Sequence, residues 1–198
     1  MIEVQTVGLV LAGGRSSRFG AEKAVQVLAG RTLLEWAHGA LAAVCGEVAV
    51  SAAPGSDAAA LAAAQGWAVL ADDDGHASGP LAGIAAGLAW AATAGAAQLV
   101  TLPCDTPGVG ADILSRLLDE SGGAFAATAD GPHALCAVWP VAALPALTAS
   151  LSGGGHPAVR DALKVAGAKP VIFAEARPFA NVNTPLDLAA LAATRSRP

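Results

Sequence analysis

TVGLVLAGGRSSRFGAEK, residues 6–23, carries the strongest indication of the fold. Its first seven residues are mostly apolar, which predicts a buried strand over residues 6–12. A glycine pair and three cations come directly after that strand: Gly13, Gly14, Arg15, Arg18 and Lys23. Glycine lets backbone N–H groups approach a ligand closely, and cations can neutralise the ligand's charge. A buried strand that runs into such a loop is typical of α/β proteins that bind phosphate groups.

Downstream of this loop, short apolar runs alternate with alanine-rich helical stretches. The expected strands are 47–53, 67–71, 97–103, 125–129, 134–139 and 169–173, with a hairpin across 130–133. The expected helices are 32–44, 57–64, one that begins near Pro80, 112–120, 141–151, 156–165 and one opened by Thr184 and Pro185. This alternation predicts a single α/β domain over residues 1–198, with a Rossmann-like three-layer α/β/α arrangement around a mostly parallel sheet.

Composition and charge exclude several classes of function. The net charge of −5 argues against a general nucleic-acid binder. The positive charge that the chain does carry lies in local clusters. Residues 77–104 carry no charged side chain, but prolines interrupt this Ala- and Gly-rich run and no Lys or Arg flanks it, so no membrane span is predicted. Three irregularly spaced cysteines, Cys45, Cys104 and Cys136, favour free thiols in a reducing cytoplasm over a disulfide framework.

Three polar segments follow predicted strands and are expected to meet at one edge of the sheet. They are AGGRSSR at 12–18, ADDDGHASGP at 71–80 and PCDTP at 103–107. Ligands of open α/β sheets bind beyond the carboxyl ends of the strands, where these segments lie. Asp105 is the strongest single candidate, because a carboxylate at the end of an apolar strand can hold Mg²⁺. The alternative is that Asp105 caps the next helix after a turn at Thr106 and Pro107.

The glycine loop matches neither of two common phosphate-binding patterns. Residues 14–20 do not end in the Gly-Lys-Ser/Thr of a Walker A loop, and no GxGxxG dinucleotide fingerprint is present. The glycines and cations through which such loops bind phosphate groups are nevertheless present. A glycine turn with solvated cations is the alternative interpretation.

Five segments together resemble, in order, the motifs of molybdenum cofactor guanylyltransferases. They are LAGGRSSRFGAEK (11–23), GPLAGIAAGL (79–88), LPCDTP (102–107), HALCAVW (133–139) and NVNTPLDL (181–188). The resemblance implies a nucleotide-diphospho-sugar transferase-like fold and Mg²⁺ as cofactor. It also implies transfer of GMP from GTP to the terminal phosphate of molybdopterin or the molybdenum cofactor, with release of pyrophosphate. A molybdoenzyme or its chaperone is the candidate recipient of the product.

The loop chemistry and the resemblance together define a predicted site. The predicted nucleotide-binding residues are Leu11, Ala12, Gly13, Gly14, Lys23, Ser51, Asp72 and Asp105, and the resemblance implies that Leu11 to Gly13, Ser51 and Asp72 contact the guanosine. Arg18, Lys23 and Asp105 are the predicted catalytic residues, and Asp105 is also the predicted metal ligand. The predicted acceptor-binding residues are His133, Asn181 and Asn183.

Several of these assignments have alternatives. Asp72 opens a triple aspartate that can also be a solvated loop, and Ser51 stands where some relatives carry asparagine. Asn181 and Asn183 suit a helix start, and His133 can pack locally. Two residues of the loop, Phe19 and Glu22, replace the methionine and aspartate of the family pattern.

The sequence is compatible with more than one nucleotide and with nucleotide binding without catalysis. LAGG, rather than the LAAG of related cytidylyltransferases, favours GTP. A nucleotidyltransferase that uses CTP or another acceptor phosphate, and a non-catalytic nucleotide-binding protein, remain alternatives. A closed zinc site is not expected, because no CxxC is present.

Overall fold

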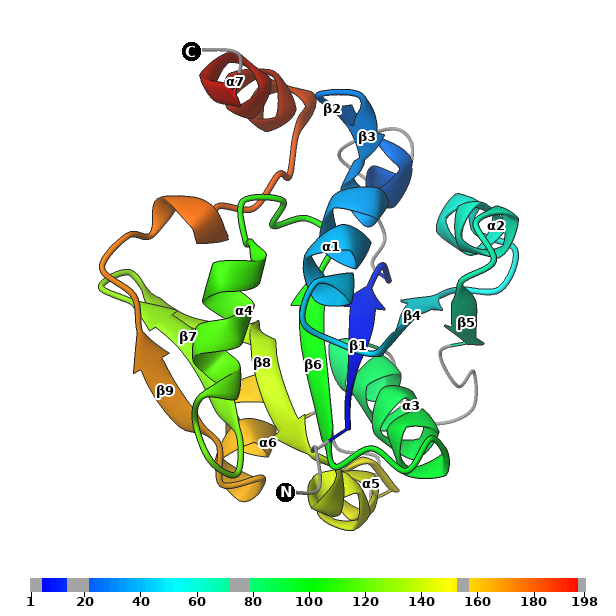
Figure 1. Cartoon of the computed structure of the whole chain (residues 1–198), viewed down its shortest axis with the longest axis vertical. Helices are drawn as coiled ribbons and strands as arrows, with labels where there is room; N and C mark the ends of the chain where they lie inside the picture. Colours follow the sequence, from blue (N-terminus) through cyan, green and yellow to red (C-terminus); the bar gives the residue numbers. More distant parts are fainter. Residues whose placement is uncertain (1–4, 14–21, 72–78, 153–156, 196–198) are drawn as a thin grey trace.

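A seven-stranded sheet forms the centre of the computed structural model, which describes residues 5–13, 22–71, 79–152 and 157–195 (Figure 1). Its strands are β1 (Thr6–Leu11), β4 (Glu47–Ala52), β5 (Ala68–Ala71), β6 (Gln98–Pro103), β7 (Ala124–Thr128), β8 (Gly131–Pro140) and β9 (Lys169–Ile172). Their order in the sheet is β5-β4-β1-β6-β8-β7-β9. All of the strands expected from the apolar runs are therefore confirmed.

Within the described residues, β8 is the one strand that runs against its neighbours in this sheet. β1 pairs in parallel with β4 and β6, and β4 pairs in parallel with β5. β8 is antiparallel to both β6 and β7, whereas β7 is parallel to β9. The predicted mostly parallel sheet is confirmed. Because β8 is reversed, its first residues lie at the same edge as the carboxyl ends of β1, β4 and β6.

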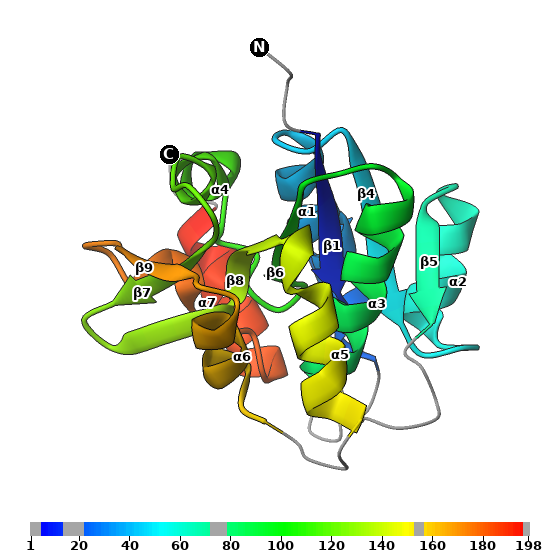
Figure 2. The ribbon, with the colours of Figure 1, turned by 90° about the horizontal axis from the view of Figure 1, so that it is seen from below.

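Helices cover both faces of the sheet, which gives the three layers that were predicted (Figure 2). The helices are α1 (Leu33–Ala42), α2 (Asp57–Ala64), α3 (Pro80–Thr93), α4 (Ala111–Leu118), α5 (Leu144–Ser152), α6 (Val159–Val165) and α7 (Pro185–Arg195). Short 3-10 turns occur as η1 (Lys23–Val25), η2 (Val141–Ala143) and η3 (Arg177–Phe179). Buried residues of α1, α2 and α4 share one core layer, and those of α3, α5 and α6 share the other.

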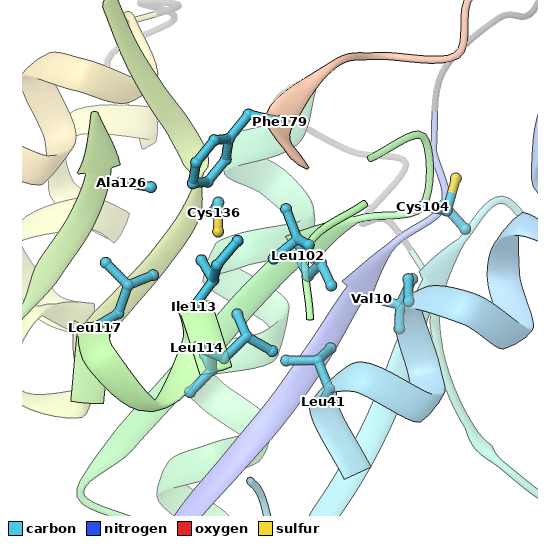
Figure 3. Close-up of a cluster of buried hydrophobic side chains, with 14 of the residues drawn as sticks. Val10, Leu41, Leu102, Cys104, Ile113, Leu114, Leu117, Ala126, Cys136 and Phe179 are labelled. Carbon is cyan, nitrogen blue, oxygen red and sulfur yellow. The ribbon is translucent and has the colours of Figure 1, made fainter. Parts of the chain in front are cut away.

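The central strands are buried on both faces, which explains their continuous apolar sequence. In β1, Val10 belongs to the α1 layer, while Leu9 belongs to the α3 layer. Figure 3 shows the α1 layer, where Val10 lies near Leu41 and Leu102. In the α3 layer, a Cβ at Gly87 would lie 2.6 Å from Leu9 Cδ2, so glycine allows close approach of the helix to β1. Among the described residues, the helices include none with the length and hydropathy that a membrane crossing requires.

A small hairpin that the sequence analysis did not predict lies between the glycine loop and α1. Its strands are β2 (Val27–Leu28) and β3 (Arg31–Thr32), and both turn residues, Ala29 and Gly30, have positive φ. α7 packs against this hairpin through a third apolar cluster (Figure 1). The first and last parts of the chain are thereby joined.

Most predicted boundaries are shifted by one to three residues in the structure, and two differences concern the β7–β8 turn and the start of α6. The β7–β8 turn lies at Ala129 and Asp130 rather than over 130–133, because Thr128 already pairs with Gly131. The helix expected over 156–165 begins at Val159, and residue 156 lies outside the described residues. Neither difference changes the order of the elements.

Candidate functional site

The ends of three neighbouring strands are held in line at one edge of the sheet. Ala12 N donates to Ser51 O at 3.0 Å, and Cys104 N donates to Leu11 O at 3.1 Å. The first bond extends the pairing of β1 with β4 to Ala12, and the second extends the pairing of β6 with β1 to Cys104. Gly13, the next residue, is exposed, and most of the other residues predicted to converge here, 14–18 and 72–78, lie outside the described residues.

Lys23 connects three distant segments of the chain at this edge. Its Nζ donates to Asp105 Oδ2 at 3.0 Å and to Asn183 Oδ1 at 2.8 Å, across 82 and 160 residues of sequence respectively. The side chains of Lys23 and Asp105 are 17% and 20% exposed, so their ion pair is largely sheltered from water. Charge-assisted bonds of this kind are stronger than bonds between neutral groups. Three of the predicted site residues therefore meet at one ammonium group.

Lys23 is fixed by the turn in which it lies. Gln26 N donates to Lys23 O at 3.0 Å, and Leu33 N donates to Gln26 O at 2.9 Å. Ala24, the next residue of η1, is 1% exposed and belongs to the core layer of α1. The η1 backbone that carries the Lys23 side chain is therefore held by the core and is not part of a solvated surface loop.

Asp105 is held by a main-chain bond and does not cap the helix that follows it. Its carbonyl oxygen accepts from Val182 N at 2.8 Å, and its side chain is the partner of Lys23. The N-cap of α4 is Gly110, five residues later. The alternative that Asp105 caps the next helix is wrong, and its carboxylate belongs to the site.

Asn183 combines a helix start with a side chain in the site. Asn183 N and Thr184 N donate to Asp187 Oδ2 at 2.9 and 2.8 Å, and Asp187 N donates to Thr184 Oγ1 at 3.2 Å. This reciprocal pattern is a capping box, which opens α7. The backbone bond from Asn183 is the main cause that lowers the pKa of Asp187. Sequence reasoning missed Asp187, although its spacing from Thr184 is the capping-box signal.

His133 is engaged in local packing. Its Nε2 lies 3.1 Å from Thr128 Oγ1, and its ring stacks on Phe179 with centroids 4.3 Å apart. Phe179 belongs to the buried cluster drawn in Figure 3 and precedes Val182, the partner of Asp105, by three residues. Burial lowers the pKa of His133, and the charge of Asp130 opposes this shift.

Of the remaining predicted residues, Ser51 and Asn181 lie in the described part of the chain. Ser51 is 2% exposed at the end of β4, beside Leu11, whereas Asn181 is exposed. Gly14, Arg18 and Asp72 lie outside the described residues.

The oxygen atoms at this site fit a hard divalent cation better than a soft one. Asp105 and Asn183 present a carboxylate and an amide oxygen to the same point, and Mg²⁺ is commonly bound by one or two such groups together with substrate phosphates and water. Over the described part of the chain, His, Cys, Asp and Glu form no group of three or more that could hold a metal by themselves. Burial raises the pKa of the Cys104 and Cys136 thiols to about 12, which keeps both protonated and makes them poor metal ligands.

A family model described as the MobA-like NTP transferase domain matches residues 8–168 of the chain. The chain is 42% identical over 189 residues to a molybdenum cofactor guanylyltransferase of Acidiphilium cryptum, with 94% of each chain covered. The family model covers β1 from Gly8 onward, the glycine loop, Lys23 and Asp105, while the asparagines near α7 lie beyond it.

Solved structures with similar folds include proteins that act on different nucleotides. Molybdopterin-guanine dinucleotide biosynthesis protein A of Archaeoglobus fulgidus superimposes with a TM-score of 0.73 at 23% identity, covering 96% of this chain and 98% of that chain. A CMP:2-keto-3-deoxy-manno-octonic acid synthetase complexed with CTP gives 0.76 at 14% identity, covering 97% and 98%. At these identities the likeness shows the fold, which is the predicted Rossmann-like α/β fold.

Proposed function

This chain belongs to the MobA-like NTP transferase family, and we propose that it transfers GMP from GTP to the terminal phosphate of molybdopterin or the molybdenum cofactor. Membership makes the chain a nucleotidyltransferase of molybdenum cofactor biosynthesis. The choice of GTP and of the acceptor rests on the 42% identity to a guanylyltransferase and on the LAGG loop. The products are the guanine dinucleotide form of the cofactor and pyrophosphate.

The observation that carries this proposal is the meeting of Lys23, Asp105 and Asn183. A carboxylate, an amide oxygen and an ammonium lie within hydrogen-bonding distance, and Cys104, the residue before Asp105, donates to Leu11 O at the end of β1. Displacement at an α-phosphate needs positioned charges more than a protein nucleophile. The attacking group is the acceptor's own phosphate oxygen, which forms the new P–O bond while the bond from the α-phosphorus to the bridging oxygen of pyrophosphate breaks.

Each side chain has a role that its position supports. Asp105 is the proposed ligand of Mg²⁺, and the Asn183 amide oxygen lies beside it. When bound, Mg²⁺ would polarise the α-phosphate and neutralise charge on the triphosphate. Lys23 is proposed to neutralise phosphate charge, and Arg18 is proposed to help stabilise departing pyrophosphate. Asn181 and His133 are proposed to contact the acceptor.

Base recognition is proposed for the segment from Leu11 to Gly13 together with Ser51 and Asp72. Ser51 is buried directly beside Leu11, which places a hydroxyl near the start of the loop. The fold itself does not distinguish GTP from CTP, because a CTP-bound synthetase has a similar structure. The choice of base is therefore tested by comparing turnover with each nucleotide.

Pyrophosphate release from each nucleotide tests the proposed function. The protein is incubated with Mg²⁺, molybdopterin and GTP, CTP, ATP or UTP in turn, and the dinucleotide product is identified by mass spectrometry. We expect turnover with GTP that requires both molybdopterin and Mg²⁺. Faster turnover with CTP would show that the guanylyl assignment is wrong.

We also propose the cellular compartment of the reaction and the recipient of its product. Free thiols at Cys45, Cys104 and Cys136 suit the reducing cytoplasm. The recipient of the product is proposed to be a molybdoenzyme or its chaperone, which would take up the dinucleotide after release.

A further inference from the structure

The carboxylate of Glu22 reaches the first residue of α2. Its Oε2 accepts the N–H of Asp57 at 2.6 Å, across 35 residues of sequence. Asp57 is the first residue of α2, and Glu22 directly precedes Lys23. The N-terminus of a helix has unpaired N–H groups and a positive partial charge, so it stabilises an anion. The bond therefore links the residue next to Lys23 to the start of α2.

α2 has a cap of its own and does not depend on Glu22. The hydroxyl of Ser56, its N-cap residue, accepts from Ala59 N at 3.1 Å. A serine N-cap of this kind is worth about 1 kcal/mol. The Asp57 N–H lies at the exposed surface, where water could accept its bond. The main consequence of the Glu22 bond is therefore expected at the Glu22 end.

The bond fixes a turn that is already tied at other points. Gln26 Nε2 donates to Glu22 O at 3.2 Å, and Gln26 N donates to Lys23 O at 3.0 Å. η1 packs against both α1 and α2. With the side chain of Glu22 bound to α2, the backbone on both sides of the Lys23 Cα is restrained.

Both ends of the glycine loop are attached to the same structural unit. The chain leaves β1 at Ala12, whose N–H is bound to Ser51 O in β4. At the other end of the loop, the carboxylate of Glu22 is bound to α2, the helix that follows β4. The position of Lys23 is thereby set relative to Ser51, so the two proposed nucleotide contacts share one frame.

The direction of the Glu22 carboxylate also matters for charge. An anion next to a phosphate-binding lysine would repel a triphosphate if it faced the same way. Here the negative charge is bound at the N-terminus of α2, while the Lys23 ammonium is bound to Asp105 and Asn183. The two neighbouring charges are therefore separated into different contacts.

We propose that Glu22 is a positioning residue for the nucleotide, which acts by holding Lys23 in register with the β4–α2 unit. This inference rests on the proposed function, because Lys23 needs exact placement only if it binds phosphates. Glu22 replaces the aspartate of the family pattern, and its longer side chain is the one that makes the bond to Asp57 N.

Two Glu22 variants and one matched control test this proposal. Glu22→Ala removes the bond, Glu22→Gln keeps an oxygen acceptor, and Ser56→Ala weakens α2 without touching the loop. We expect Glu22→Ala to raise the KM for GTP about tenfold, which corresponds to about 1.4 kcal/mol, while kcat changes less than about twofold. Glu22→Gln should stay within about threefold of the parent KM. Ser56→Ala should lower Tm at least as much as Glu22→Ala but leave KM unchanged.

Two outcomes would overturn the proposal: an unchanged KM in Glu22→Ala, or an equal rise in Ser56→Ala, which would indicate a general effect of helix stability. The Kd for Mg²⁺–GTP is measured by calorimetry on the same proteins. A parent protein that binds GTP but releases no pyrophosphate with molybdopterin would contradict the proposed function. The tenfold difference in Kd would then still decide the role of Glu22.

Discussion

Lys23 and Asp105 are joined by an ion pair of 3.0 Å although 82 residues separate them in the sequence. The same ammonium holds Asn183, so the beginning, middle and end of the chain meet at one charged group. This arrangement places a cation where a divalent ion and a triphosphate are proposed to bind. Substitution of each residue in turn should separate the contributions of the three partners.

Asp105→Ala should lower kcat by at least about a hundredfold, because the proposed metal ligand is lost while the main-chain bond from Val182 remains. Turnover and Tm are measured together. The control is Asp161→Ala, which breaks a 3.1 Å ion pair with Lys164 at the exposed surface and should leave both values nearly unchanged. Full activity of the Asp105 variant would end the metal hypothesis.

Lys23→Met should change nucleotide and metal binding in opposite directions. The KM for GTP should rise about tenfold, because a phosphate partner is lost. Affinity for Mn²⁺ without nucleotide, measured by electron paramagnetic resonance, should instead increase, because the ammonium no longer competes for Asp105 and Asn183. Lys164→Met is the control at an exposed ion pair. A parallel loss of both affinities would show that Lys23 supports the local structure rather than competing with the cation.

Asn183→Ala and Asp187→Ala should separate the two roles of the α7 start. Asn183→Ala removes the contact with Lys23 but keeps its backbone bond to Asp187, so activity should fall about tenfold with little change in Tm. Asp187→Ala removes the capping-box acceptor and should lower Tm, with a smaller effect on activity. Identical profiles for the two variants would mean that the segment acts only as a helix start.

The layers and strands could be predicted because burial on both faces leaves a strong local signal. Leu9 and Val10 are adjacent and both fully buried, so the run around them is apolar throughout. The β2–β3 hairpin gave no comparable signal, because two-residue strands are too short to show a period. Its turn also uses Ala29 at a φ of 49°, a conformation that alanine rarely adopts.

The membership of the site could be predicted only in part. Asp105 was recognisable, because a carboxylate at the end of an apolar strand lies where the ligands of open α/β sheets bind. The contact between Lys23 and Asn183 spans 160 residues, and it depends on how α7 packs against the hairpin. No local pattern encodes that packing. The Glu22 bond was missed for the same reason, because a helix start and a loop residue are paired only in the folded chain.

His133 should make stability depend on pH. Burial lowers the folded-state pKa of His133, so the folded protein favours the neutral imidazole. The stability that this neutral side chain provides is fully present above the ordinary pKa of 6.5, and it is lost as the pH falls through that value toward the folded pKa. His38, stacked on Trp67, has a pKa lowered by the same cause. Free energies of unfolding at pH 7.5 and 5.5 should therefore converge partly in His133→Gln and partly in His38→Gln. An unchanged pH dependence in both variants would contradict this assignment.

Thr101 should stabilise the strand irregularity that lies beside the site. Between the pairs Phe125–Ala137 and Ala126–His133, β8 advances four residues while β7 advances one. The Thr101 hydroxyl donates to Leu135 O within this bulge at 2.9 Å.

Thr101→Val should lower the free energy of unfolding by about 1–3 kcal/mol, because it keeps the shape but leaves buried groups unpaired. The Trp139 indole N–H, which donates to the Thr101 hydroxyl at 3.1 Å, loses its partner as well. Thr148→Val is the matched control, since the Thr148 hydroxyl bonds a carbonyl on the exposed face of α5 and its loss should cost less than about 0.5 kcal/mol. Denaturant unfolding measures both variants. Equal costs would mean that the buried network contributes no more than a surface bond, and that the bulge is held by the packing of Trp139 alone.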